Sequence, residues 1–392
     1  MLPLDGVFDN HFHEGHSKEV KPDKVKVVIS DCHLSAGLQF ESTRNPHEDF
    51  YFDDEMVEFV QYFSTGRYGN GMDVELIING DFFDFLNVPY QGQFEEVITE
   101  QFALYKLECI MRGHPKVMNA FREFVKQEGK TITYNIGNHD ADLFFPKLQE
   151  HFVKTIDPEG AYPSKKVRVN HEQPHIEVEG GIYIEHGNNY EAVHLLNYNK
   201  PLISDGLPEP VLNIPWGSIY VLKIINRFKW ERDYVDKVRP VKAMIFWGLF
   251  TDTLFTLRFM VTSCYYFIKT RFVYSPTRRS RLAVTARIIQ QETQTFLQDL
   301  QDAARYVLDT KGDHHTVIFG HTHLPMHKTY SDGRSYLNTG TWTKMINMDF
   351  RGLGEGNSYK LTFALIEIKN GRSTASLQQW HGDHKPHRTF NG

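Results

Sequence analysis

The chain has few cysteines, and none of them are paired in sequence. Its 392 residues include three, Cys32, Cys109 and Cys264, with no Cys-x-x-Cys spacing. Without a disulfide framework a reducing compartment is the simplest expectation, so we predict a cytoplasmic protein. Residues 1–20 lack both a basic start and an apolar core, and therefore do not resemble a signal peptide.

A strong charge of either sign is also absent. The net charge is −6, and hydrophobic and charged residues make up 41% and 23% of the chain, which are ordinary values for a soluble globular protein. This composition by itself does not indicate a particular binding partner. The length suffices for a large core in one or two domains. No internal repeat and no low-complexity linker interrupts the sequence.

An uninterrupted apolar run of membrane-spanning length is missing too. The longest apolar stretch, Ala243 to Ile268, contains Asp252 and Arg258. A spanning helix would carry both charges near its middle, at a cost of about 2.5–3.5 kcal/mol each. We therefore predict no transmembrane helix. Residues 201–290 hold 14 Lys or Arg against 6 Asp or Glu, a local charge of +8, and many aromatic residues. We expect residues 188–311 to form an inserted, mainly helical, basic and aromatic cap, ending in an amphipathic helix over 289–308.

The first half of the chain alternates between strand and helix patterns. Apolar strand patterns at 25–29, 74–78 and 131–134 alternate with helical spacing over 49–65 and over 94–124, the latter interrupted at Gly113-His114-Pro115. This rhythm favours a mixed α/β sheet with helices on a face. Later turn signals predict hairpins at 176–184, 327–337 and 361–379, and with them a second, more antiparallel sheet.

Five segments place polar side chains directly after β-type runs. They are Asp31-Cys32-His33, Gly80-Asp81-Phe82-Phe83-Asp84, Gly137-Asn138-His139-Asp140, His186-Gly187 and Gly320-His321-Thr322-His323. Asp, Asn and His ligands delivered to one place by strand ends can hold two divalent cations close together, and imidazole favours transition metals over Ca or Mg. The predicted ligands are Asp31, His33, Asp81, Asn138, His186, His321 and His323.

Other residues in these segments have distinct expected roles. His139 follows a ligand and should point over the site, where it can act as a general acid or as a cation toward phosphate. Asp84 is placed to orient His139. For Asp140 a supporting role and simple surface solvation remain equally open. Cys32 is expected to pack rather than to ligate.

Several histidines and carboxylates have less specific explanations. A single strand-end Asp or His is most often a cap or a hydrogen-bonded core group, and only the five contexts together point to a metal centre. The terminal sets His11, His13, His16 and His381, His384, His387 are expected in solvated tails. His114, His194, His314 and His315 lack strand-end context, so we do not include them in the site.

In this order the five segments resemble the calcineurin-like metallophosphoesterase superfamily, whose pattern is Asp-x-His, Gly-Asp-x-x-Asp, Gly-Asn-His-Glu/Asp, His and Gly-His-x-His. The resemblance covers about residues 24–187 and 313–380 and implies a four-layer αββα sandwich. One metal would take Asp31, His33, Asp81 and His323, and the other Asp81, Asn138, His186 and His321. The segment 338–342 is similar to the family's Asn-x-Gly-Ser turn, with Thr341 in place of Ser. The implied organisation is a tail at 1–23, a catalytic domain at 24–187 and 312–380, the cap at 188–311, and a tail at 381–392.

The resemblance implies a metal-dependent phosphoric ester hydrolase, in which water activated by two cations attacks phosphorus, with Mn expected ahead of Fe or Zn. A cap between the single His and the Gly-His-x-His block resembles the UDP-2,3-diacylglucosamine pyrophosphatases, although that group more often carries Arg at the position of His139. A lipid-linked phosphodiester or pyrophosphate is therefore expected, with residues 201–290 contacting the inner membrane surface.

Three alternatives remain. The chain could be a nucleotide or nucleic-acid phosphodiesterase that holds phosphates with Arg278, Arg279, Arg281 and Arg287. It could be a non-enzymatic, metal-dependent scaffold of the same fold. The insert could also be a helical hairpin packed on the core or at a dimer interface.

Overall fold

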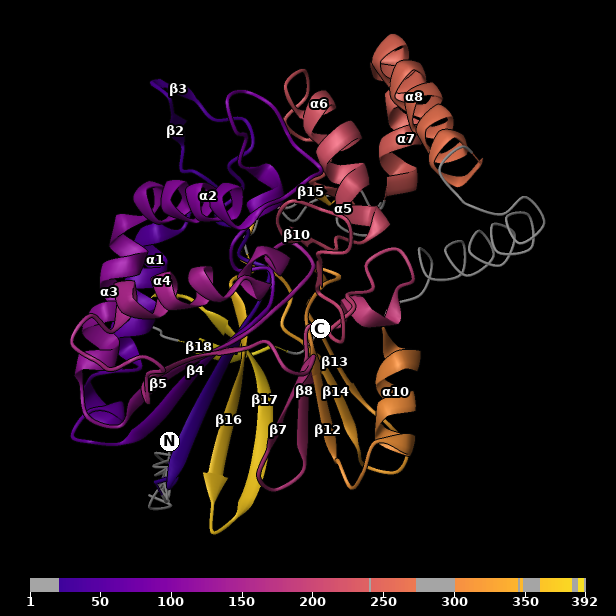
Figure 1. Ribbon diagram of the computed structural model, residues 1–392. Helices are drawn as coiled ribbons and strands as arrows, with labels where there is room; N and C mark the ends of the chain where they lie inside the picture. The colour runs from indigo at the N-terminus through magenta and orange to yellow at the C-terminus, as the bar shows by residue number, and fades with distance from the viewer. Residues whose placement is uncertain are drawn as a thin grey trace, which may run out of the picture.

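Two β-sheets face each other in the computed structural model, which describes residues 21–239, 241–272, 300–344, 346–347, 360–382 and 387–390 (Figure 1). The first sheet has the strand order β18-β17-β16-β1-β4-β5-β6. Its strands are β1 (Lys24–Ile29), β4 (Asp73–Asn79), β5 (Lys130–Asn135), β6 (Val167–Asn170), β16 (Thr362–Lys369), β17 (Arg372–Trp380) and β18 (His387–Thr389). Strands β1, β4, β5 and β6 pair in parallel, whereas β16, β17 and β18 add antiparallel.

The second sheet is smaller and has the order β13-β14-β12-β8-β7. Its strands are β7 (His175–Val178), β8 (Ile182–Glu185), β12 (Thr316–Phe319), β13 (Met326–Thr329) and β14 (Ser335–Asn338). The three central strands, β8, β12 and β14, are parallel, and the edge strands β7 and β13 run antiparallel to them. The carboxyl ends of β8 and β12 therefore meet at one edge, as those of β1, β4 and β5 do in the first sheet.

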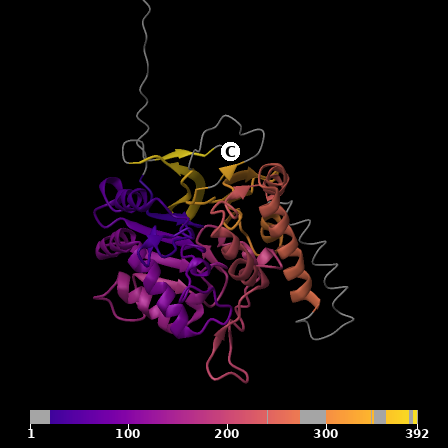
Figure 2. The same ribbon diagram turned by 90° about the horizontal axis from the view of Figure 1, so that it is seen from above.

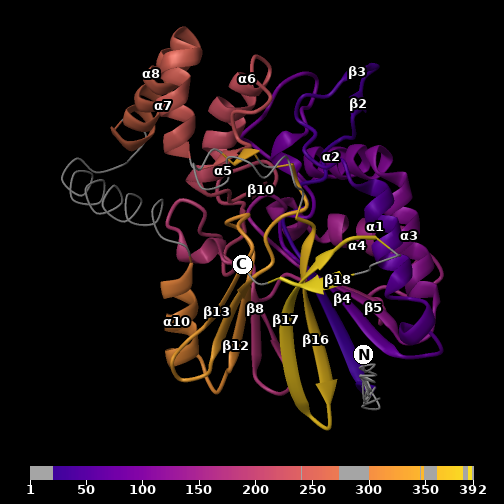
Figure 3. The same cartoon turned by 180° about the vertical axis from the view of Figure 1, so that it is seen from behind.

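Helices cover the outer face of each sheet. Helices α1 (Asp53–Tyr62), α2 (Glu100–Gly113), α3 (Pro115–Lys126) and α4 (Pro146–Ile156) lie on the first sheet, and α10 (Gln301–Thr310) lies on the second (Figure 3). In β1, Val27 packs toward the helices and Val28 toward the second sheet. Both faces of this strand are buried, which explains its continuous apolar sequence. The predicted four-layer αββα architecture is confirmed.

The segment between β8 and α10 contains mostly short elements. After the 3-10 turn η4 (Asn188–Tyr190) come β9 (Leu202–Ile203), β10 (Val211–Leu212), α5 (Trp216–Tyr220), the π-helical turn η5 (Val221–Ile225) and α6 (Asn226–Lys229). They are followed by β11 (Val238–Arg239), which pairs with β15 (Ile346–Asn347), and by α7 (Val241–Thr251) and α8 (Thr253–Phe272). Seen from above, α7 and α8 lie on the side away from α1–α4 (Figure 2).

The remaining elements are short. They are β2 (Gln39–Phe40), β3 (Thr43–Arg44), η1 (Gly66–Tyr68), η2 (Phe85–Asn87) and η3 (Ala141–Phe144). Among the described residues, no helix combines the length and the apolar character needed to cross a bilayer.

Some expectations about strand pairing were wrong. The 361–379 hairpin is present as β16 and β17, but it joins the first sheet by pairing with β1, and the second sheet has a parallel centre. A hairpin pattern predicts its own two strands, whereas the neighbour that its outer edge takes is decided by packing. The C-terminal tail is only partly a tail, since His387 starts β18 and its half-buried ring contacts Tyr62 and Phe63.

Other expectations fall partly or wholly outside the described residues. Helix 49–65 is shorter than predicted, because α1 begins at Asp53. Of the amphipathic helix over 289–308, the structure describes α10 from Gln301 onward. His11, His13, His16 and His384 lie outside the described residues, as do the four arginines at 278–287.

Candidate dinuclear metal centre

The seven predicted ligands all follow strand ends at the same edge of the two sheets. Asp31 and His33 come after β1, Asp81 after β4, and Asn138 after β5 in the first sheet. His186 comes after β8, and His321 and His323 come after β12 in the second. The ligands from the first sheet and His186 are buried, and His321 and His323 are partly buried. Parallel strands that end together thus bring residues from five distant segments into one place.

The backbone at this site adopts a conformation that side chains rarely tolerate. Five of the seven predicted ligands have φ in the left-handed region, with values of 53° at Asp31, 53° at His33, 52° at Asp81, 69° at His321 and 61° at His323. Non-glycine residues take such φ values at an energetic cost, and this kind of strain concentrates at functional sites. The tight turns aim the side chains into the space between the sheets.

A first group of donors consists of Asp31, His33 and His323, whose ligand atoms lie within 4.8 Å of one another. His33 Nε2 is 3.0 Å from His323 Nε2, and the same His323 atom is 3.4 Å from Asp31 Oδ1. Two imidazole nitrogens and a carboxylate oxygen at such spacing match the donor set of a divalent transition metal.

A second group consists of Asp81, His186 and His321, whose ligand atoms also lie within 4.8 Å of one another. Asp81 Oδ2 is 3.1 Å from His186 Nε2 and 3.9 Å from His33 Nε2. One carboxylate oxygen therefore lies between the two groups, where a ligand shared by two cations belongs. The grouping follows the division of ligands that the family resemblance implies.

The buried side-chain atoms without a hydrogen-bond partner include two atoms of predicted ligands, His186 Nε2 and Asn138 Oδ1. His186 Nδ1–H donates to the carbonyl oxygen of Asn79 at 2.8 Å, so Nε2 is the ring nitrogen that lies beside Asp81. Buried polar atoms are nearly always satisfied, so unpartnered donor atoms on two predicted ligands fit a metal site. The residues present thus suit the pair of divalent cations that the fold implies.

The local charges also suit cations. Burial would raise the pKa of the Asp81 carboxyl, but the neighbouring His186 and His139 hold it well below its usual range. Burial would lower the pKa of His186, but Asp81 and Asp31 raise it to about 10. The carboxylates are therefore ionised and attract positive charge into a buried site.

His139 and Asp84 form a pair beside the donor groups. His139 Nδ1 is 3.1 Å from Asp84 Oδ1, and Asp84 Oδ2 accepts a hydrogen bond from His33 Nδ1 at 3.0 Å. Asn87 donates to Asp84 through its backbone N–H at 3.1 Å and its side-chain amide at 2.8 Å. Burial opposes protonation of His139, yet Asp84 and Asp81 raise its pKa to about 9. Asp84 thus contacts both His139 and the predicted ligand His33.

Asp140 supports the loops that carry the predicted ligands. Its buried carboxylate accepts hydrogen bonds from Gly137 N–H at 2.6 Å, Tyr134 O–H at 2.6 Å and Phe82 N–H at 3.1 Å. Burial and the nearby Asp81 charge raise its pKa to about 7. Of the two open roles, surface solvation is thus excluded, and Asp140 ties the loop after β4 to the loop after β5.

Gly80 shows why the motifs carry glycine. Its φ is +79°, and a Cβ at this position would lie 2.6 Å from the imidazole of His186. Any side chain here would push His186 away from Asp81.

Two residues near the site were not predicted. Glu191 Oε2 accepts a hydrogen bond from His321 Nε2–H at 2.9 Å, and the His194 ring lies 5.1 Å from the His321 ring. Burial opposes the shift, but His321 lowers the pKa of Glu191 to about 2. The prediction that His194 is not part of the site, which was based on its sequence context, was therefore wrong about where this residue lies. The turn η4 folds the chain back toward β12, and no local sequence pattern predicts this reversal.

The insert contacts the site directly. Gly217 N–H donates to Val193 carbonyl oxygen at 2.8 Å, and Ser218 Oγ donates to the carbonyl oxygen of the predicted ligand Asn138 at 3.4 Å. A Cβ on Gly217 would lie 2.6 Å from His194 Nδ1. Helix α5 thus packs on the metal-site loops, and only glycine permits this approach.

A buried ionic network fixes the next part of the insert to the core. Lys229 Nζ lies 2.5 Å from Asp49 Oδ2 and 2.7 Å from Asp236 Oδ2, and Lys237 Nζ lies 2.8 Å from Asp49 Oδ1. Asn226 also donates to Leu86 carbonyl oxygen at 2.7 Å. These bonds hold α6 against the loops before α1 and after β4.

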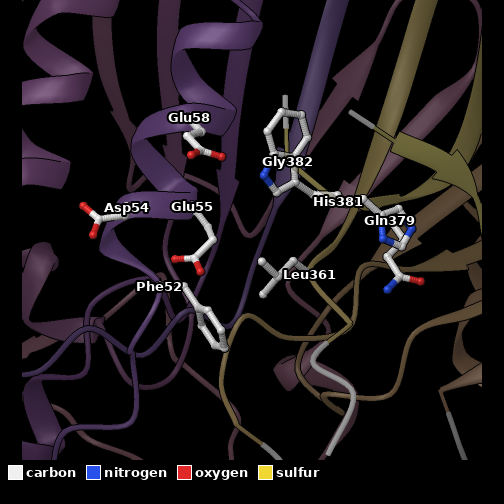
Figure 4. A pocket seen from close by; sticks show the side chains of 9 residues that line it. Phe52, Asp54, Glu55, Glu58, Leu361, Gln379, His381 and Gly382 are labelled. Atoms are coloured by element: carbon white, nitrogen blue, oxygen red, sulfur yellow. The ribbon is translucent and has the colours of Figure 1, made fainter. Parts of the chain in front are cut away.

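A separate cavity of about 330 Å³ lies beside α1. The carboxylates of Asp54, Glu55 and Glu58 line one side, and Leu361, Gln379 and His381 line the other (Figure 4). None of the seven predicted ligands lines it. Its acidic wall would repel a phosphate, so it is not the substrate site.

Comparison with known proteins returns similarity to solved structures alone: no family of sequences and no curated protein matches the chain. A dimetal phosphatase from Danio rerio is 10% identical, with a TM-score of 0.37, covering 94% of this chain and 98% of its own. A predicted phosphoesterase from Streptococcus pneumoniae is 12% identical, with a TM-score of 0.29, covering 94% and 97%. A Zn-bound Vps29 from Entamoeba histolytica is 22% identical, with a TM-score of 0.17, covering 24% and 45%.

These TM-scores are below 0.5, so we rest the assignment on the molecule itself. Five strand-end segments occur in the family's order, two facing sheets bring them together, and the side chains of six of the seven predicted ligands gather in two donor groups. In its fold and in the arrangement of its candidate ligands, the chain is similar to the calcineurin-like metallophosphoesterases.

Proposed function

We propose that this chain is a metal-dependent phosphoester hydrolase with a dinuclear centre. The observation that carries the proposal is the position of Asp81 Oδ2 between His186 Nε2 at 3.1 Å and His33 Nε2 at 3.9 Å, each belonging to a separate donor group. Two bound cations would supply water activation and stabilisation of charge on the phosphoryl group. We propose the ligand sets given above, with Mn as the first metal to test and Fe or Zn next.

The protein's own residues would prepare the site for an anionic substrate. Asn138 contributes a neutral oxygen, which limits the negative charge that a phosphate meets. His139, paired with Asp84 and with a pKa raised to about 9 by the Asp84 and Asp81 carboxylates against the effect of burial, is protonated at neutral pH. It would hold its proton for the leaving-group oxygen or bind a phosphoryl oxygen as a cation.

We propose further that the substrate is a phosphodiester or pyrophosphate linked to a lipid. The insert that contacts Asn138 through Ser218 is rich in apolar residues, and Ile224, Phe228, Met244, Phe255 and Phe259 form a cluster within it. Its sequence is basic over 201–290, which suits phosphate groups. A cap of this chemistry beside a phosphoesterase site fits an amphiphilic substrate, processed at the inner membrane surface.

Hydrolysis of bis-p-nitrophenyl phosphate by metal-depleted protein, with and without added Mn²⁺, tests the reaction class. We expect Mn²⁺-dependent turnover and two metal equivalents per chain by elemental analysis. The Asp81→Asn variant should lose turnover and bind less than one equivalent, because both donor groups lose their shared carboxylate. Metal binding without turnover in the unmodified chain would instead favour a non-enzymatic scaffold.

The substrate class needs a separate comparison. We expect a lipid-linked pyrophosphate in detergent micelles to be cleaved faster than the same head group without its acyl chains. Equal rates, or faster cleavage of a dinucleotide, would contradict the lipid-linked substrate and leave the reaction class intact.

A further inference from the structure

Helices α7 and α8 form a hairpin that presents apolar side chains to solvent. On α8 these are Leu254, Leu257, Val261, Tyr265 and Ile268, and on α7 they include Phe246, Leu249 and Phe250. Leu254 is 84% exposed, Phe250 72% and Val261 67%. Soluble proteins rarely leave a contiguous apolar patch of this kind without a partner.

The pattern on α8 is regular rather than scattered. The exposed positions recur at intervals of three or four residues, so they form one stripe along the helix. The opposite stripe is apolar too, since Phe255 and Phe259 pack on Phe228 of α6 at ring distances of 5.6 and 5.2 Å. One stripe therefore packs α8 against α6, and the other faces outward, where a surface helix would normally carry polar residues.

The charge of the hairpin indicates what kind of partner covers this apolar stripe. The hairpin, residues 241–272, contains four Lys or Arg and one Asp. The one acidic residue of the hairpin, Asp252, is paired with Arg232 at 2.6 Å. A second copy would bring two basic surfaces together, whereas an anionic surface attracts one.

From these observations we infer that the exposed face of the α7–α8 hairpin docks on an anionic lipid bilayer. Aromatic and aliphatic side chains enter the interfacial layer, and basic residues meet the lipid phosphates. The hairpin lies in the interface and does not span it, consistent with the positions of α7 and α8 beyond both sheets (Figures 1 and 2).

Sedimentation with vesicles tests this docking surface in the full chain. Phosphatidylcholine vesicles with and without phosphatidylglycerol are compared, using a Phe250→Ser/Leu254→Ser/Val261→Ser variant. A matched control is Leu38→Ser/Val97→Ser/Tyr162→Ser, which replaces three exposed apolar residues elsewhere on the surface. We expect the unmodified chain and the control to sediment with phosphatidylglycerol vesicles, and the hairpin variant to lose on the order of tenfold in partitioning.

Soluble-substrate hydrolysis in the same samples separates this inference from the proposed function. The hairpin variant should keep its circular dichroism spectrum and its turnover of bis-p-nitrophenyl phosphate, because the three positions are exposed and distant in sequence from every ligand. Equal sedimentation of variant and unmodified chain would overturn the inference. The inference would also be overturned if the unmodified chain stayed in the supernatant. It would then be either a dimer that the hairpin variant dissociates or a monomer whose apolar face is covered by another part of the same chain.

Discussion

Asp84 contacts two imidazoles for which we propose different roles, so substitutions of His139 and Asp84 should have different effects. His139→Gln removes a group that is not among the proposed ligands, and we expect kcat to fall about 10²- to 10⁴-fold with metal content unchanged. Asp84→Asn should lower kcat and also weaken metal binding, because Asp84 accepts a hydrogen bond from His33 at 3.0 Å. Turnover combined with elemental analysis checks both. Metal loss from His139→Gln would mean that His139 is itself a ligand.

Glu191 is a positioning residue by geometry. Because a carboxylate only accepts, the 2.9 Å contact puts the proton of His321 on Nε2 and leaves Nδ1 as the metal-binding nitrogen. We expect Glu191→Ala to weaken metal binding by about 10- to 100-fold. Competition with a metal-binding dye measures this affinity without reference to turnover.

Two further variants make the Glu191 experiment specific. Glu191→Gln keeps a hydrogen-bond acceptor and should restore part of the affinity that Glu191→Ala loses. Glu177→Gln, in an exposed carboxylate of β7, should change nothing. Unchanged affinity in Glu191→Ala would show that His321 is held by other contacts.

At the scale of elements, His114 joins helices α1, α2 and α3. It lies between the end of α2 and the start of α3, with Nε2 3.1 Å from Glu48 Oε2 and Nδ1 3.0 Å from Asp53 Oδ1. Burial opposes protonation, but Glu48 and Asp53 raise its pKa from 6.5 to about 9. A buried imidazolium held by two carboxylates is a structural feature that is independent of the metal site.

This pKa makes stability depend on pH in one direction. A folded pKa of about 9 against 6.5 unfolded corresponds to about 3 kcal/mol of folding free energy, present below pH 6.5 and lost as pH rises through 9. We expect His114→Asn to be less stable than the unmodified chain at about pH 6, with the difference shrinking by about pH 10. Urea unfolding at both pH values measures it. A difference that does not vary with pH would mean that His114 is neutral.

The strands themselves were largely predictable, whereas their neighbours were not. The apolar runs at 25–29 and 74–78 correspond to β1 and β4 within a residue or so, because a strand buried on both faces has a continuous apolar sequence. The sheet that β16 and β17 join could not be predicted from their hairpin. That choice depends on β1, more than 300 residues earlier in the chain.

At the scale of the whole molecule, metal removal should loosen the contact between the two sheets. Donors from the first sheet, such as Asp81, face donors from the second, such as His186, and a ligand that binds only the folded state stabilises it by about 2.7 kcal/mol at a hundred times its Kd. We expect a chelator to lower Tm by several degrees and Mn²⁺ to restore it. Asp81→Asn, measured by differential scanning fluorimetry, should respond weakly to both. An unchanged Tm in the unmodified chain would indicate that the sheets do not depend on metal.

The sequence alone determined the strand ends and predicted the seven candidate ligands and the pairing of His139 with Asp84, because each depends on residue type and on short-range spacing. It also indicated a basic, aromatic insert from composition. Tertiary structure decided which donors face one another, that Asp140 is buried, and that Glu191 and His194 reach His321 through the turn after His186. It likewise decided that α8 keeps an apolar outer stripe. The reason is the same throughout: local pattern sets a residue's conformation, whereas its partner is fixed only when distant segments pack together.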